Sequence, residues 1–337
     1  MPNIDLSKIQ LAYGRHERPE DGMSFLEAVS WVAREPFGDQ PKCVSLAIAA
    51  FGRSWNDALS DEERNQILKP LIPKLIGTRT TDEDEETRTW LATDWLVRVH
   101  TPAWLRLAGL EDEARALEAL PRIEDATSAS EAQPAVERAR QRAVAARDAA
   151  GAALRAAAWG VAGEFARGSA WSGARYAAED AAESSGGEPA WNAAWEPYAA
   201  RAARAAAGDA TRDAALKATE AAAWAATVDV AADAARGSWS AWVAGEGAAW
   251  AAAWAAAAKD ASAKSQDDDE VSDAAWEAAR VAAGNDARDA ARASAVAADT
   301  KARDAAAAKL RPTVKRLQQS AVTLLEAMCK VGNRHQP

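Results

Sequence analysis

The chain has 337 residues, a formal net charge of −10 at pH 7 and a hydrophobic share of 49%. This length can build two domains whose cores need no metal or disulfide, and two cysteines, Cys43 and Cys329, cannot form a disulfide framework. The most apolar window, 247–258, is well short of the roughly 20 residues that span a bilayer, and the first ten residues lack the pattern of a secretory signal. We therefore expect a cytoplasmic protein without membrane association.

Charge is distributed unevenly along the chain. Residues 1–133 hold 15 Lys and Arg against 24 Asp and Glu, whereas residues 134–337 hold 25 against 26. Nucleic-acid binding requires clustered cations, and almost every Arg of the second part has an acidic residue within one helical turn. We therefore expect no nucleic-acid partner.

Two capping-box signatures open helices in the first part of the chain. Ser24 and Glu27 precede an apolar stripe that should end before the next proline, and residues 41–58 predict a second helix. Ser60 and Glu63 repeat the signature before a further helix, which two prolines in its second half should bend. These patterns predict short helices that pack around an apolar core in the first part of the chain.

A further helix should begin after Thr81, because its first turn is acidic, as the positive end of a helix dipole favours. His100 falls in its last turn, where the dipole favours a cation. Two short helices at 102–108 and 111–120 close a compact acidic head domain, and 124–134 has the composition of a linker. The head domain accordingly covers residues 1–123.

Residues 135–331 predict an alanine- and tryptophan-rich bundle or array of long helices. Alanine, the strongest helix former, fills 74 positions of 135–310. Turn signals divide this part into helices near 135–184, 189–235, 238–264 and 271–331. Residues 147–159 and 212–224 match at nine of thirteen positions, which indicates a duplicated helical unit.

Several tryptophans of this part are expected to form its core. Alanine faces let helices approach closely but bury little apolar area per residue, so large rings are needed to supply it. The predicted core residues are Trp159, Trp191, Trp195, Trp224, Trp250 and Trp254. A tryptophan-lined ligand groove is the alternative interpretation.

The head also holds the candidate site residues. The sequence contains no HExxH pattern, no glycine-rich phosphate loop and no CxxC pair, so we predict no catalytic residue, no metal ligand and no cofactor. Polar residues that could bind a ligand or partner are His16, Glu17, Glu27, Glu35, Asp39, Arg53 and Asp57. Convergence of these residues on one pocket would favour an enzyme, and dispersal would favour a binding protein.

Four segments of the head resemble an uncharacterised family of bacterial and phage-encoded proteins. The segments are HERPEDG, EAVSWVAREP, FGRSWND and DWLVRVHTPAWLRLAGL, which begin at residues 16, 27, 51 and 94. Members of that family often carry Cys in place of Ser24 and Ser45 and His in place of Gln40, beside a Cys that matches Cys43. If these residues form a metal or thiol site in the family, this chain keeps only Cys43. The resemblance implies a recurring folded head and no particular chemistry.

These patterns together predict an all-α, non-catalytic binding or scaffold protein. The head would recognise an unknown protein partner, and the alanine- and tryptophan-rich helices would serve assembly or self-association. An enzyme of unknown reaction, with a polar or metal site around His16, Glu27 and Cys43, is the alternative function.

Overall fold

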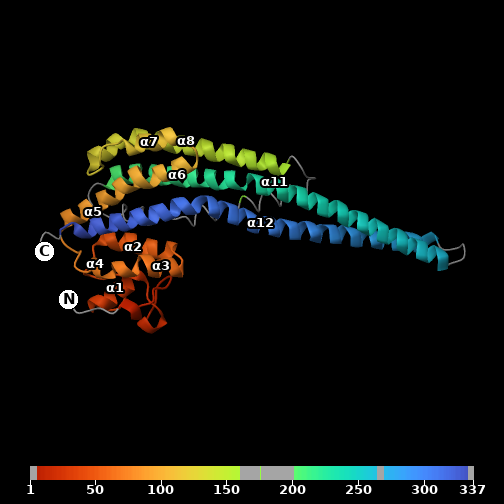
Figure 1. The fold of residues 1–337 in the computed structure, drawn as a ribbon, viewed down its shortest axis with the longest axis horizontal. Coiled ribbons are helices and arrows are strands. Elements are labelled where there is room, and N and C mark those ends of the chain that lie inside the picture. The colour runs from red at the N-terminus through yellow and green to blue at the C-terminus, as the bar shows by residue number, and fades with distance from the viewer. Residues whose placement is uncertain (1–5, 160–174, 176–200, 264–268, 333–337) are drawn as a thin grey trace. The chain divides into compact units, whose positions relative to one another are not determined.

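The computed structural model describes residues 6–159, 175, 201–263 and 269–332 (Figure 1). Every regular element of this part is a helix, which confirms the all-α prediction, and its one isolated bridge joins Leu11 to Met23. The described chain divides into two compact units. The described residues of the first unit are 6–147, 201–220 and 310–332. The helices of the second unit are formed by 148–159, 221–263 and 269–309.

The head residues form short helices in the predicted order. They are η1 (Leu6–Lys8), η2 (Pro19–Asp21), α1 (Phe25–Ala33), α2 (Leu46–Ala58), α3 (Asp61–Ile67), η3 (Lys69–Leu71), α4 (Ile72–Leu75), α5 (Asp82–Trp95), η4 (Leu96–His100), α6 (Thr101–Leu107) and α7 (Glu111–Glu118). Both predicted capping boxes form, and Thr81 caps α5. The two prolines split the helix expected after Ser60 into α3, η3 and α4, since proline cannot donate a helical hydrogen bond. Helix α2 begins later than predicted, because the Ser45 hydroxyl caps it by accepting from the Ile48 amide.

Three long helices follow, and they correct two predicted boundaries. They are α8 (Ala126–Trp159), α11 (Arg201–Ala263) and α12 (Asp269–Lys330). Most of the expected linker at 124–134 is the first part of α8, where Asp125 accepts a hydrogen bond from the Ser128 amide at 2.8 Å. The predicted break near 236–238 is absent, because α11 continues through it. Against alanine in a helix, a Gly costs about 1 kcal/mol and a Ser less, and alanine precedes and follows them closely.

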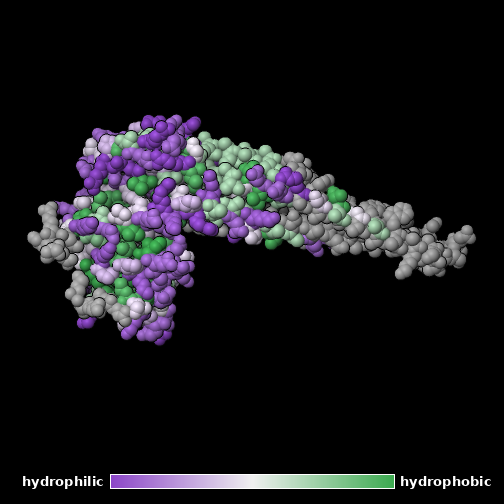
Figure 2. Space-filling model, in the orientation of Figure 1, coloured by the Kyte–Doolittle hydropathy of each residue, from purple (hydrophilic) through white to green (hydrophobic). Residues whose placement is uncertain are grey.

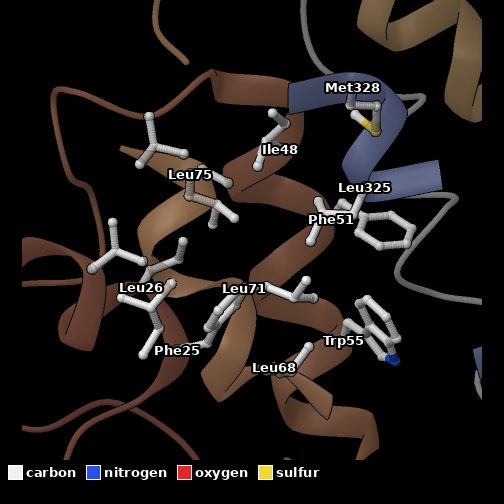
Figure 3. Packing of buried hydrophobic residues seen from close by; sticks show 14 of the residues in the cluster. Phe25, Leu26, Ile48, Phe51, Trp55, Leu68, Leu71, Leu75, Leu325 and Met328 are labelled. Carbon is white, nitrogen blue, oxygen red and sulfur yellow. The ribbon is translucent and has the colours of Figure 1, made fainter. Parts of the chain in front are cut away.

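The head core is completed by the last turns of α12. Leu325 and Met328 are buried in the same apolar cluster as Phe25, Ile48 and Phe51. Figure 3 shows these two side chains beside α2, although more than 260 residues of chain separate them from it. The end of α12 therefore contributes to the core of the predicted head of 1–123. The division into head, linker and tail stays a prediction.

A buried arginine, paired with a glutamate of its own helix, holds the end of α12 against the head. The Arg88 guanidinium is buried, and its Nε donates to the Met328 carbonyl at 3.1 Å and its Nη2 to the Val331 carbonyl at 2.7 Å. Its Nη1 lies 3.1 Å from Oε1 of Glu85, and the other oxygen of that carboxylate accepts from the Ser45 hydroxyl at 2.6 Å. Arg88 thus binds carbonyl groups that the end of a helix leaves without intrahelical partners.

Helices α8 and α11 run side by side in the same direction (Figure 1). In the first unit, Arg140 pairs with Asp213 at 3.3 Å and Arg147 with Glu220 at 3.9 Å. In the second unit, the ring of Trp224 covers Gly151, where an added Cβ would lie 2.5 Å from Cζ3 of that ring. The two pairs of the first unit and the contact of the second unit each join residues that are 73 positions apart in the chain.

Of the predicted tryptophan core, the structure describes only one side chain. Trp224 is buried, with 9% of its surface exposed. Trp191 and Trp195 lie outside the described residues, as do the side chains of Trp159, Trp250 and Trp254. Their role in the core, like the internal repeat, stays a prediction.

We predict that Leu325→Ala lowers the free energy of unfolding of the full chain by about 2 to 5 kcal/mol, because it opens a cavity in the head core. Gln319→Ala, at an exposed position of the same helix, is the matched control and should change stability by less than about 0.5 kcal/mol. Urea unfolding followed by circular dichroism measures both. Equal stability of the two variants would contradict a shared core of head and α12.

Two of the helical glycines, Gly151 and Gly247, should respond to alanine in opposite ways. Gly151→Ala should destabilise the chain by about 1 to 3 kcal/mol, because the new methyl group meets the rigid Trp224 ring. Gly247 has no described atom within 4 Å of an added Cβ, so Gly247→Ala should gain up to about 1 kcal/mol of helix propensity. Thermal unfolding compares them, and stabilisation by both substitutions would contradict the α8–α11 contact.

Candidate functional site

The structure joins two of the predicted site residues, His16 and Glu27. The His16 amide donates to Oε1 of Glu27 at 2.8 Å, and the ring Nδ1 lies 2.9 Å from Oε2. The Ser24 amide donates to the same Oε2 at 2.8 Å. Burial raises the pKa of Glu27, but the hydrogen bonds from the His16 and Ser24 amides and from the ring outweigh it, so the pKa is lowered. Glu27 therefore carries a buried negative charge beside an imidazole.

This pair has the geometry of an oriented histidine. A carboxylate that binds Nδ1 fixes the ring and leaves Nε2 as the nitrogen that can exchange protons or bind a ligand. The Nε2 atom lies against the backbone of Gly22, where an added Cβ would be 2.9 Å away. The same contacts also bind His16 and Ser24 to Glu27 in the first turn of α1, so the pair also stabilises the fold.

A second polar group surrounds Asn56, which was not among the predicted site residues. Its side chain accepts from the Phe25 amide at 3.1 Å and donates to the Ala12 carbonyl at 3.3 Å. It also donates to Oδ1 of Asp57 at 3.1 Å, so Asp57 touches this group from the exposed end of α2. Asn56 thereby joins α2 to the N-terminal segment and to the start of α1.

Three other predicted residues, Glu35, Asp39 and Arg53, stabilise the loop between α1 and α2. Glu35 accepts from the amides of Lys42 at 2.5 Å and Cys43 at 2.9 Å. Arg53 donates through Nη1 to the carbonyl of Asp39 at 3.0 Å, so only the backbone of Asp39 takes part. Glu17 is exposed. These residues share no hydrogen bond with His16 or Glu27 among the described contacts.

The thiol of Cys43 is not activated as a nucleophile. Burial raises its pKa, and the Glu35 carboxylate beside it raises it further, to about 11. A reactive cysteine needs a lowered pKa, because the thiolate is the nucleophile and the metal ligand. The alternative function around His16, Glu27 and Cys43 stays a prediction, but at neutral pH this cysteine is protonated.

His100 corrects another expectation. It was predicted as a cation favoured by a helix end, but the structure buries its ring, with 2% of the residue exposed. It ends η4, a π-helix, and its Nε2 accepts from Nε1 of Trp104 at 3.2 Å, while the ring of Trp95 lies 5.2 Å away. No described atom accepts a hydrogen bond from its Nδ1. A π-turn is not recognisable from helical periodicity, so the sequence carried no signal for this environment.

Comparison of the chain with protein-family models, with curated proteins and with solved structures gave no match. The resemblance of the head to a bacterial and phage family therefore stays a hypothesis. Within the described ranges, no helix is apolar over a sufficient length to cross a bilayer. The same ranges contain no cluster of three or more His, Cys, Asp and Glu side chains arranged to hold a metal ion.

We predict that Glu27→Gln destabilises the protein by about 1 to 3 kcal/mol at pH 7, because the neutral amide is a weaker acceptor for the His16 and Ser24 groups. The lowered pKa means that ionised Glu27 stabilises the fold at pH values above its ordinary pKa, and that this contribution is lost as pH falls through the folded-state pKa. The difference between the variant and the unmodified chain should therefore shrink in acid. Glu17→Gln is the exposed control, and urea unfolding at pH 7 and pH 3 provides the test.

Proposed function

We propose that this chain is a cytoplasmic, non-catalytic binding or scaffold protein whose head recognises a protein partner. The observation that carries the proposal is the exposure of two aromatic residues of the head, Trp31 at 53% and Tyr13 at 67%. Tryptophan and tyrosine dominate the energetics of protein interfaces, because each supplies a large contact area at little cost in side-chain entropy. The residues of α1 from Phe25 to Ser30 are buried, so Trp31 is the first exposed residue of that helix.

The polar groups of the head support this function by holding α1 rigid. Glu27 and Asn56 bind the loop and amides at its start, and the Ser30 hydroxyl donates to the Gly38 carbonyl at 2.7 Å near its end. A side chain on a fixed backbone loses less conformational entropy on binding than one on a mobile loop. Figure 2 shows mainly hydrophilic side chains over the described surface of the head on the face in view, with smaller apolar areas between them.

The long helices would serve assembly with another copy or with a further protein. Of their described side chains, Val243 on α11 and Val281 and Val296 on α12 are exposed by about half or more of their surface. Exposed branched aliphatic residues on long helices are suited to helix-to-helix association. Sedimentation equilibrium of the purified full chain measures self-association directly. If the chain is a monomer at all concentrations, the long helices do not bind a second copy, and only assembly with a different protein remains.

The test of the head places a photo-crosslinking amino acid at Trp31 or at Tyr13 in the full chain. Irradiation in native lysate should join both positions to the same protein, whereas the same probe at Arg122, an exposed head residue, should not. Trp31→Ala should reduce capture of that protein and change the free energy of unfolding by less than about 1 kcal/mol. Identical products from all three positions, or none from Trp31 and Tyr13, would contradict recognition through these aromatic residues.

A further inference from the structure

The joint between α5 and α6 has an unusual construction. The chain passes from α5 through the π-helix η4 directly into α6, and the Thr101 amide donates to the Leu96 carbonyl. In a π-turn each amide binds the carbonyl five residues earlier instead of four. Such turns are rare in proteins, and many of those known lie at functional sites. His100 and Trp104, one helical turn apart, connect η4 to α6 through their side chains.

The hydrogen bond between these two residues fixes the protonation state of the ring. Indole Nε1 of Trp104 is a donor only, so Nε2 of His100 must be the acceptor and must carry no proton. A proton taken from solvent by Nε2 would turn the acceptor into a donor, and two donors would face each other at 3.2 Å. The new charge would also lie in a buried position between the rings of Trp95 and Trp104.

We propose that this joint is an acid-sensitive hinge, in which protonation of His100 breaks its contact with Trp104 and loosens α6. Helix α6 also holds α11, because the Thr101 hydroxyl donates to the Thr211 carbonyl at 3.5 Å. Loosening of α6 therefore weakens its contact with α11 within the first unit. The proposal is independent of partner recognition, since it concerns the state of the free chain.

The electrostatics of the joint agree with this geometry. Burial of the ring lowers the pKa of His100, to about 4. The charged residues Asp94 of α5 and Arg98 of η4 are paired with each other at 3.2 Å, and Asp94 also accepts from the Ile123 amide at 2.9 Å. A folded-state pKa below the ordinary value of about 6.5 means that the closed joint is stable at neutral pH and loses stability as pH falls from about 6.5 through 4.

Hydrogen exchange with mass spectrometry on the full chain tests the hinge. Between pH 7 and pH 4, after correction for the intrinsic exchange rate, protection of 96–107 should fall by a factor of up to about 100, the ratio that pKa values of about 6.5 and about 4 give over this pH range. Protection of α2 should change much less. Equal loss in both segments would indicate global acid unfolding and would overturn the proposal.

Two variants separate His100 from other titrating groups. His100→Gln provides an amide oxygen that can accept from Trp104 but cannot be protonated in this range, so it should keep 96–107 protected at pH 4. His16→Gln removes the other described histidine and should leave the acid response unchanged. Because His100→Gln could fail to fold, the ring of His100 is also titrated by NMR in the unmodified chain. An ordinary pKa near 6.5 in the folded protein, or an unchanged acid response in a folded His100→Gln variant, would overturn the hinge.

Discussion

The buried contact between Arg88 and the end of α12 is the constraint on which the first unit depends. One guanidinium binds two carbonyls of the C-terminal segment and the carboxylate of Glu85, while Leu325 and Met328 enter the core beside it. Removal of Glu85 would leave the buried charge of Arg88 uncompensated, whereas removal of Arg88 would also remove the two hydrogen bonds that join α5 to the C-terminal segment. Further contacts extend this connection, with Gln318 bound to Glu63, Ser320 to Trp95 and Glu326 to Lys74.

The polar residues that looked like a candidate site are mostly used to hold backbone. Glu27 and Glu35 accept from amides, Arg53 donates to a carbonyl, and the missed Asn56 bridges three segments. Short helices leave many terminal amides without partners, and buried carboxylates and amides satisfy them. This explains why so small a head is rich in polar side chains, and it leaves the exposed aromatic residues as its most distinctive surface feature.

The alanine-rich helices show what a small side chain permits and what it costs. Alanine at nearly half of the positions of α8 and α11 lets the two helices approach closely, and Gly151 makes room for the ring of Trp224. Among the described side chains of the second unit, one apolar cluster joins Leu154 to two alanines, with Val228 and Val230 packed against them. Alanine surfaces contribute little burial per residue, so a single ring in a close contact carries much of the packing.

Local signals in the sequence were sufficient to predict that the chain is helical and where several of the head helices begin. Capping boxes at Ser24 and Ser60, the acidic first turn after Thr81 and the high alanine content are local signals, because helix propensity and capping act within one or two turns. Only the tertiary structure decided that α12 completes the head core, that His100 is buried in a π-turn, and that the candidate polar residues form separate groups. These features depend on contacts between residues far apart in the chain, or on burial, and neither leaves a periodic signal in one sequence.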